Sequence, residues 1–412
     1  MSVVDLHAHL PMYCAPGPGM SGRLRLRMVR NAGRRSGNFV AGTGAPRVTV
    51  PALRRGGVEV ALSVLYSPWD EMGLARRDLR RVAGVVSALR ALRRHARLPN
   101  AGSAVSLALA ALVADRPPNR GAFRRLLTQM DCVERFYERR HGAELRFARS
   151  PREVAQARAD GRVALVHAVE GGFHLPPDPR EVPAAVAELA RRGVAYVTVA
   201  HLFRRGVATV APAIPYLDDA AFHALFPQPG EGLAAHGRAT IEALVAHGVL
   251  IDVSHMADVS LHETFELLDR LDPERRVPVL ASHVGARLGN QAYNLPDWAI
   301  AQIAERGGVV GLIAATHQLA DGRPDPATFE ESMEVMFGHV DAIAAVTGGH
   351  DHTALGTDLG GFIEPLPGVP DAAALAAVRA ALERRYGPDA AAAIGAGSAL
   401  RLLEGHWGSG RS

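Results

Sequence analysis

The chain has 412 residues, of which 48% are hydrophobic and 21% charged, a composition typical of a globular protein of one large domain or two domains. Its two cysteines exclude a disulfide framework and a four-thiolate metal site. All 46 basic residues are arginine, and the absence of lysine excludes a Schiff base, a P-loop and a carbamylated-lysine bridge between metal ions.

The charge is unevenly distributed along the chain. Residues 1–150 contain 26 Arg and 10 acidic residues and the remainder contains 20 and 32, so the two parts carry +16 and −12, which sum to +4. A basic part can bind nucleic acid or an acidic partner, but without an aromatic stacking pattern we favour arginines on solvated helices that pack against the acidic remainder. No basic stretch precedes an apolar run at the start, and the longest apolar run, from Ala101, is too short to span a bilayer. We therefore expect a cytoplasmic protein with no membrane or nucleic-acid partner.

Short apolar runs alternate with amphipathic stretches along most of the chain. The amphipathic stretches at 182–193, 239–248 and 296–308 each end at glycine, as helices often do. The apolar runs predict strands at 3–10, 59–66, 163–170, 194–202, 249–255, 277–283, 308–314 and 353–358. Eight such repeats predict an α/β fold of the (β/α)8 barrel type, in a single domain over 1–412.

Two segments interrupt this alternation. Residues 68–150 are rich in Ala, Leu and Arg and are interpreted as a helical insertion between the second and third strands. Residues 204–235 are rich in Pro, Ala and aromatic residues and follow the fourth strand. Since barrel active sites lie at the carboxyl ends of the strands, we expect this second segment to cover the site. Residues 392–407 are predicted to form a closing helix.

Ionisable residues mark the carboxyl ends of six of the predicted strands. The first strand ends in a His-x-His pair, and positions two apart on a strand lie on the same face. Seven such groups at six strand ends are hard to explain by core packing, because buried charges need partners. The candidates are His7, His9, Glu170, His201, His255, His283 and Asp358.

Imidazoles and carboxylates without thiolates suit zinc, manganese or iron in an open catalytic site. Four histidines that share one carboxylate are enough to hold two divalent metal ions, with Glu170 as the available bridge. A water held between two cations loses a proton near neutral pH, so hydrolysis is the expected chemistry.

The positions of other histidines relative to the predicted strands indicate their roles less directly. His174 and His317 follow predicted strands and are candidates for the pocket wall. His350 and His352 precede the eighth strand, so we expect them at the opposite end of the barrel and reject them as ligands. His167 is expected to face away from Glu170 and to pack against a helix. The glycine-containing stretch at 41–46 lacks the strand-to-helix context of a nucleotide loop.

The quoted motifs "DLHAHLP", "VEGG", "VTVAHLF", "GLAAHGRATIEALVAHGVLIDVSHM", "SHVGAR…NLPD" and "LGTDLGG" resemble, in order and spacing, those of the membrane (renal) dipeptidase family of the amidohydrolase superfamily. The resemblance implies a binuclear zinc barrel that cleaves the amide bond of dipeptides with a metal-bridging hydroxide. It implies that His7 and His9 hold one metal, that His255 and His283 hold the other, and that Glu170 bridges them. By the same resemblance His201 holds the substrate or the oxyanion, and Asp358 passes a proton from the attacking water to the leaving amine.

Two positions depart from the family pattern. His9 stands where most of the family has aspartate, which leaves a more positive metal site that should favour anionic substrates. Tyr293 stands where the family has the arginine that grips the dipeptide's carboxylate, and Arg287 is the candidate substitute in substrate binding. The substrate therefore stays open between dipeptides and N-acyl amino acids, lactones or other small amides. A second alternative is a non-catalytic binding protein that uses the basic N-terminal part. The sequence also leaves open whether the chain forms a homodimer.

Overall fold

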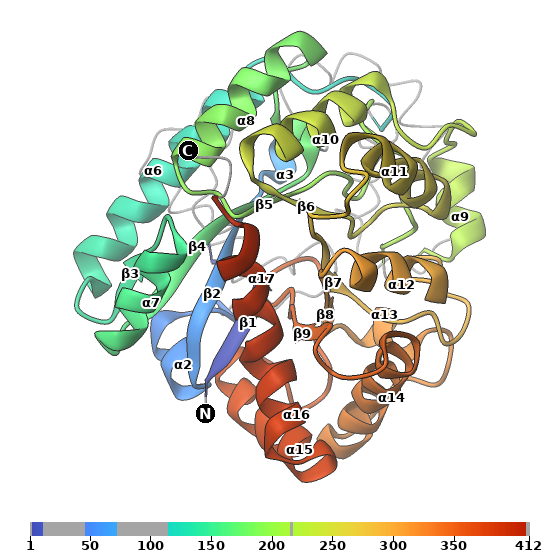
Figure 1. Cartoon of the computed structure of the whole chain (residues 1–412). Coiled ribbons are helices and arrows are strands. Elements are labelled where there is room, and N and C mark those ends of the chain that lie inside the picture. Colours follow the sequence, from blue (N-terminus) through green and yellow to red (C-terminus); the bar gives the residue numbers. More distant parts are fainter. Residues whose placement is uncertain (1, 11–45, 72–113, 215–216, 409–412) are drawn as a thin grey trace.

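The computed structural model describes residues 2–10, 46–71, 114–214 and 217–408. Eight parallel strands close into a barrel (Figure 1), because β2 pairs with β1 on one side and with β4 on the other. The barrel strands are β1 (Val3–Ala8), β2 (Val58–Leu65), β4 (Val163–Glu170), β5 (Tyr196–Thr198), β6 (Leu250–Asp252), β7 (Val279–Val284), β8 (Val309–Leu312) and β9 (Thr353–Leu355). The predicted α/β barrel is confirmed.

Several strands are shorter than the apolar runs that predicted them. β5 ends at Thr198, although the apolar run continues to 202, and Val199 and Ala200 are buried beyond the strand. The residues after the strand are apolar because they are packed in the protein core, although they do not pair with a neighbouring strand. Hydrophobic pattern alone does not separate core packing from strand pairing.

The insertion after β2 contains helices and one strand in its described part. α3 (Pro68–Glu71) and the long α6 (Ala122–His141) fit the helical prediction. β3 (Leu145–Phe147) was not expected, and it pairs in parallel with Val163–Leu165 at the start of β4. A three-residue strand is too short for its alternation to be recognised in the sequence. Residues 72–113 of the insertion, and 41–45 of the glycine-containing stretch, lie outside the described residues.

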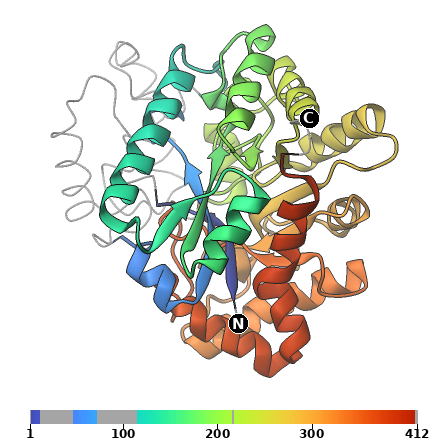
Figure 2. The same ribbon diagram turned by 60° about the vertical axis from the view of Figure 1, so that its left-hand side comes forward.

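Helices surround the barrel, as the turned view shows (Figure 2). The predicted helices are present as α8 (Val182–Arg191), α10 (Ala235–His247) and α12 (Asp297–Glu305). The closing helix is interrupted: α16 (Pro388–Ala392) passes through a π-helical turn, η5 (Ala393–Gly397), into α17 (Ser398–His406). Within the described residues the other helices are α2 (Val50–Arg55), α7 (Pro151–Ala159), α9 (Asp219–Leu225), α11 (Asp258–Leu271), α13 (Thr316–Ala320), α14 (Phe329–Thr347) and α15 (Leu375–Tyr386), with 3-10 turns η2 (Gly172–His174), η3 (Pro179–Glu181) and η4 (Ala372–Ala374).

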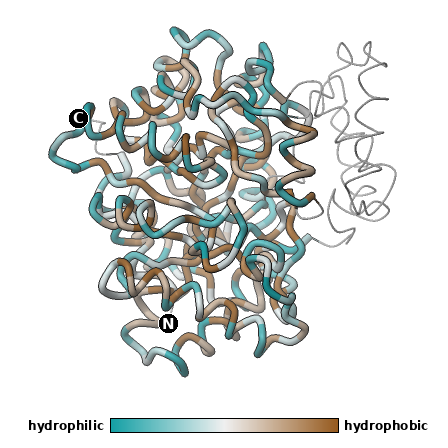
Figure 3. The backbone as a smooth tube through the Cα atoms, turned by 90° about the vertical axis from the view of Figure 1, so that its right-hand side faces the viewer, coloured by the Kyte–Doolittle hydropathy of each residue, from teal (hydrophilic) through white to brown (hydrophobic). Residues whose placement is uncertain are grey.

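The barrel strands are buried on both faces, because helices cover the outside and side chains fill the inside. Most of their residues are therefore apolar, and the hydropathy colouring of Figure 3 shows hydrophilic segments mainly at the outer turns. A polar residue inside such a strand is consequently conspicuous. None of the described helices has both the length and the apolarity that crossing a membrane requires.

Candidate metal centre and active site

The candidate residues converge at the carboxyl ends of the barrel strands. His7 and His283 lie within β1 and β7, Glu170 is the last residue of β4, and the others follow their strands by one to three residues. Every one of these side chains is buried, with at most 8% of the residue exposed. The set brought together is His7, His9, Glu170, His201, His255, His283 and Asp358.

Glu170 occupies the centre of this group. Its Oε1 atom lies 3.1 Å from Nε2 of His7 and 3.4 Å from Nε2 of His283. Its Oε2 atom lies 3.4 Å from Nε2 of His9 and 3.3 Å from Nε2 of His201. One carboxylate therefore faces four ring nitrogens from three different segments of the chain, as a bridging ligand would.

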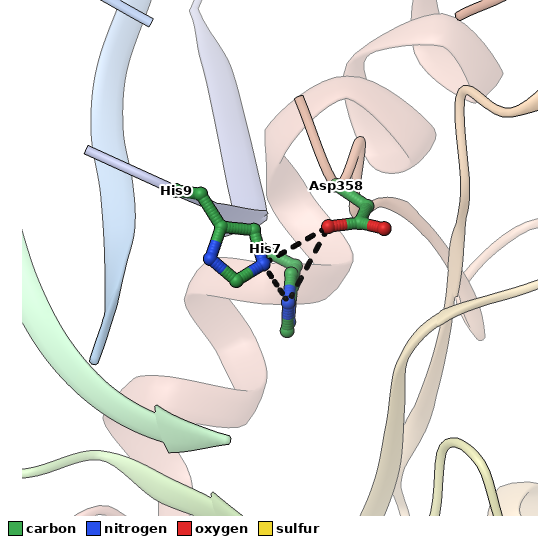
Figure 4. A group of neighbouring side chains, drawn as sticks. All are labelled: His7, His9 and Asp358. Atoms are coloured by element: carbon green, nitrogen blue, oxygen red, sulfur yellow. Dashed lines mark hydrogen bonds and ion pairs between the residues drawn. The ribbon is translucent and has the colours of Figure 1, made fainter. Parts of the chain in front are cut away.

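The imidazoles approach one another closely in two pairs. Nε2 of His7 and Nε2 of His9 are 3.2 Å apart, and Nε2 of His255 and Nε2 of His283 are 2.9 Å apart. Two nitrogens at this distance repel unless a proton or a cation lies between them. Within the described residues, three overlapping groups have donor atoms within 4.8 Å of one another: His7, His9 and Asp358 (Figure 4); His7, Glu170 and His283; and Glu170, His201 and His255.

A buried hydroxyl fixes the tautomers of two of these histidines. Ser282 Oγ donates its proton to Oδ2 of Asp252 at 2.6 Å, so it can only accept from Nδ1 of His283 at 2.7 Å and from Nδ1 of His7 at 3.1 Å. The Tyr196 hydroxyl donates to a main-chain carbonyl and likewise accepts from Nδ1 of His7, at 2.8 Å. The Nδ1 protons assigned in this way leave the Nε2 lone pairs of both rings directed at the centre, as metal ligation requires.

The electrostatics of the centre favour the protonation states of metal ligands at Glu170, His255 and His283, whereas the charge of Glu170 outweighs burial and raises the pKa of His7. Burial by itself would raise the pKa of Glu170, but the imidazoles of His201, His7 and His9 outweigh it and hold that pKa well below its usual range. Burial, reinforced by neighbouring imidazoles, lowers the pKa of His255 and of His283 well below the usual value. An ionised carboxylate and neutral imidazoles are the forms that bind divalent cations.

Two of the candidate residues have strained backbones. His255 has φ of 68° and Asp358 has φ of 55°, in the left-handed region that residues other than glycine rarely adopt. Asp358 is held there by its N–H, which donates to the His7 carbonyl at 2.9 Å, and by the preceding Thr357, whose hydroxyl donates to Asp5 at 2.7 Å. Such conformations cost about 1–3 kcal/mol each and cluster at functional sites. The turn places Oδ1 of Asp358 3.0 Å from Nε2 of His9.

A second buried carboxylate, Glu71, lies beside the centre and was missed in the sequence. Its Oε2 atom is 2.7 Å from Nδ1 of His201, and it is fully buried. Burial lowers the pKa of His201, but the charges of Glu170 and Glu71 outweigh burial and raise it to about 10. The available signal was an acidic residue shortly after the second strand, in "YSPWDE".

The centre opens into a pocket that is lined by residues from several segments of the chain. Its polar side is formed by five of the candidate residues, and its other side is largely apolar. Ala213 belongs to the 204–235 segment that was expected to cover the site. The lining consists of His9, Glu170, His201, His255 and Asp358 with Leu202, Ala213, Tyr293, Ile313, Gln318, Phe362 and Ile363.

Of the three further residues predicted to bind substrate, one lines the pocket and two do not. Tyr293 lines the pocket, and its hydroxyl donates to the His283 carbonyl at 2.7 Å. Arg287 does not line it, since the guanidinium pairs with both oxygens of Asp258 at 2.9 and 2.7 Å. His317 lies half-buried in α13, where the next residue, Gln318, supplies the lining instead.

The other four histidines considered in the sequence analysis, His167, His174, His350 and His352, lie away from the pocket lining. His174 accepts a hydrogen bond from the Ser67 N–H at 3.3 Å and its ring contacts that of Tyr66. His167 packs on Phe147 and lies 3.4 Å from Glu134 of α6, as its predicted helix contact required. His350 and His352 precede β9 and belong to none of the three donor groups found among the described residues.

A parallel barrel with imidazoles and carboxylates gathered at the carboxyl ends of its strands is the architecture of a metal-dependent hydrolase. The model of the membrane dipeptidase family, peptidase family M19, matches residues 43–406, and the chain belongs to this family. The resemblance predicted from the motifs is thereby confirmed. The matched range begins after His7 and His9, so these two ligand candidates rest on the structure and on the motif itself.

Relatives of known sequence share part of the chain. An uncharacterized protein from the pqqA 5' region of Klebsiella pneumoniae is 30% identical over 223 residues, which are 54% of this chain and 74% of that protein. An uncharacterized dipeptidase of Schizosaccharomyces pombe is 25% identical over 219 residues, 53% of this chain and 46% of its own length.

Solved structures match nearly the whole chain. A metallopeptidase from Rhodobacter sphaeroides, liganded with a phosphinate mimic of the dipeptide L-Ala-D-Ala, has a TM-score of 0.65 and 21% identity and covers 99% of both chains. The probable dipeptidase PvdM from Pseudomonas aeruginosa has a TM-score of 0.63 and 18% identity over 90% of this chain and 91% of that one. At these identities the likeness shows the fold.

Proposed function

We propose that the protein is a zinc-dependent hydrolase that cleaves the amide bond of dipeptides or dipeptide-like small molecules and uses two divalent metal ions. The observation that carries the proposal is the convergence of four imidazoles, those of His7, His9, His255 and His283, on the single carboxylate of Glu170. The dipeptide mimic bound by the Rhodobacter sphaeroides relative supports the substrate class.

The donor set fits the proposed ions. His7 and His9 would hold one ion, His255 and His283 the other, and Glu170 would bridge them. The Nε2 lone pairs of His7 and His283 already face inward, and nitrogen and oxygen donors without thiolate suit a catalytic zinc site. Two bound divalent ions would supply Lewis acidity toward the substrate carbonyl and acidify a water molecule.

The remaining polar groups of the pocket have distinct tasks in the proposed hydrolysis. Asp358 accepts a proton from the attacking water and delivers it to the leaving amine as the carbon–nitrogen bond breaks. Its Oδ1 atom is buried, forms no hydrogen bond in the described structure and lies 3.0 Å from Nε2 of His9, and both residues line the pocket. His201 directs Nε2 toward the pocket and holds the carbonyl oxygen as negative charge develops on it.

A second candidate substrate class is favoured by the apolar wall of the pocket. In the described lining, the only basic side chains are the imidazoles on the metal side. Tyr293 directs its hydroxyl to a main-chain carbonyl, and Arg287 is paired with Asp258. A lactone or small amide without a free carboxylate would fit this wall better than a zwitterionic dipeptide does.

The test combines metal analysis with a substrate panel. We expect purified protein to lose activity in EDTA and to recover it with about two zinc equivalents per chain. Substrates are L-X-D-X dipeptides, matched N-acyl amino acids, lactones and neutral amides. Glu170→Gln should lose bound metal, whereas Glu134→Gln, which removes a carboxylate that contacts His167 outside the site, should keep it. A protein that cannot be loaded with metal would refute the proposal.

A further inference from the structure

We propose that Glu71 is a positioning residue, which holds the ring of His201 with a proton on Nδ1 and so directs Nε2 into the pocket. The inference rests on the proposed function, because the held ring is the one assigned to the substrate's carbonyl oxygen. Glu71 lies outside the proposed ligand set, is fully buried, and places Oε2 2.7 Å from Nδ1 of His201.

The hydrogen bonds around Glu71 determine the orientation of its carboxylate. Oε2 accepts from the Tyr66 hydroxyl at 2.7 Å as well as from His201, and Oε1 accepts from the Phe203 N–H at 3.2 Å. An ionised carboxylate has no proton to donate, so the ring proton of this contact belongs to His201. Burying an unpaired carboxylate is costly, and these donors offset that cost.

Hydrogen bonds connect the chain segment that contains Glu71 to the segment that contains His201. Arg205, which is 1% exposed, donates from Nη1 to the Asp70 carbonyl at 2.7 Å and to the Glu71 carbonyl. Phe203, between His201 and Arg205, supplies the N–H that binds Oε1. The distance between the carboxylate and the ring is therefore set by a common segment, residues 201–205, and not by a free side-chain rotamer.

This arrangement leaves one ring nitrogen for the pocket. Nε2 of His201 lies 3.3 Å from Oε2 of Glu170 and lines the pocket with it. A donor at that nitrogen gains strength as the substrate's carbonyl oxygen becomes negative. A carboxylate on the opposite nitrogen keeps the ring oriented and stabilises its positive charge, as in other carboxylate–histidine pairs. Loss of the carboxylate should therefore act on kcat more than on KM.

Glu71→Gln is the diagnostic substitution. The Phe203 N–H requires the amide oxygen at the Oε1 position, which turns the amide NH2 toward His201 and makes Nδ1 the acceptor. The ring then carries a proton on Nε2 alone and loses both its positive charge and its charged partner. We expect kcat to fall about 10- to 100-fold, with KM within about threefold of wild type and with metal content unchanged.

Glu144→Gln is the matched control, because Glu144 Oε2 lies 2.9 Å from Nδ1 of His141 in a partly exposed pair on the protein surface. This variant should keep wild-type kcat and KM. A Glu71→Gln enzyme with wild-type kcat, or one whose activity falls only in proportion to lost metal, would overturn the proposal.

A spectroscopic readout tests the same contact without turnover. With 15N-labelled histidine, the wild-type protein should show a strongly hydrogen-bonded proton on Nδ1 of His201, assigned by its absence in His201→Gln and lost in Glu71→Gln. A wild-type His201 without an Nδ1 proton refutes the proposal even if Glu71→Gln does not fold. If the wild type cleaves none of the panel, the proposed function fails, while this spectrum still decides whether Glu71 holds the ring.

Discussion

Ser282→Ala should weaken the two proposed metal sites unequally. The substitution removes the hydroxyl that accepts from Nδ1 of both His7 and His283. The His7 ring retains its second acceptor, the Tyr196 hydroxyl at 2.8 Å. The His283 ring has no other side-chain acceptor among its described contacts, so its Nδ1–H becomes a buried donor without a partner.

The expected loss of metal affinity at each site follows from the number of acceptors that remain for each Nδ1–H. Leaving a buried donor unsatisfied costs about 1–3 kcal/mol, and loss of a hydrogen bond that orients a metal-ligating histidine lowers metal affinity about 10- to 100-fold. We expect this loss at the proposed metal site of His255 and His283. The proposed site of His7 and His9 should lose no more than about threefold in affinity, since one of two acceptors remains.

Competition with chromophoric chelators at constant pH and ionic strength would resolve the two binding constants. Thr198→Val is the matched control, because the Thr198 hydroxyl also donates to Oδ2 of Asp252, at 2.5 Å, and its described hydrogen bonds include no imidazole. The control should keep both constants near wild type. Equal losses at both sites, or no loss in Ser282→Ala, would refute the tautomer assignment.

Three further predictions concern the proton carrier, the packing behind the centre and the response to acid. Asp358→Asn should lower kcat about 10²- to 10⁴-fold with zinc content unchanged, and loss of metal together with activity would instead make Asp358 a ligand. Gly356→Ala would bring a Cβ into the Ser282 carbonyl oxygen and should destabilise the fold by about 1–3 kcal/mol in urea unfolding, whereas Gly230→Ala, with nothing within 4 Å, should not. Burial lowers the pKa of His174 from 6.5 to about 4, so the unfolded chain binds the extra proton and stability falls as pH drops through this range. At pH 5 the loss is about 2 kcal/mol relative to neutral pH, and His174→Gln should remove about that much of the change in unfolding free energy between pH 7 and pH 5; an unchanged pH dependence would contradict the assignment.

The candidate site was accessible from the sequence because of how a parallel barrel is packed. Both faces of its strands are covered, so the strands consist mostly of apolar residues. An imidazole or carboxylate at the end of such an apolar run is therefore easily recognised in the sequence. His7, Glu170 and His283 were found in this way, and the structure places Nε2 of His7 and Nε2 of His283 3.1 and 3.4 Å from Oε1 of Glu170. The rule that all strands of a parallel barrel end at the same rim was then enough to predict that these residues lie close together.

The partners of these residues were not accessible in the same way. Glu71 is the last residue of the short helix α3, in a polar stretch where an acidic residue is unremarkable, and only the fold brings it 2.7 Å from His201. Arg287 was a reasonable substitute for a carboxylate-binding arginine, yet the loop after β7 directs it to Asp258. β3 was not predicted, because it lies in a segment whose composition indicates helix.

Local pattern thus determined the strand–helix alternation, the fold class and the residues with metal-binding chemistry, since each depends on neighbours a few positions away. Only the tertiary structure decided which ring nitrogen faces the centre, which carboxylate stands behind His201 and which side chains form the pocket wall. Those properties depend on contacts between residues far apart in the chain, such as Ser282 with His7 and Tyr196 with His7. Strand register and loop path create these contacts, and neither leaves a periodic trace in the amino-acid sequence.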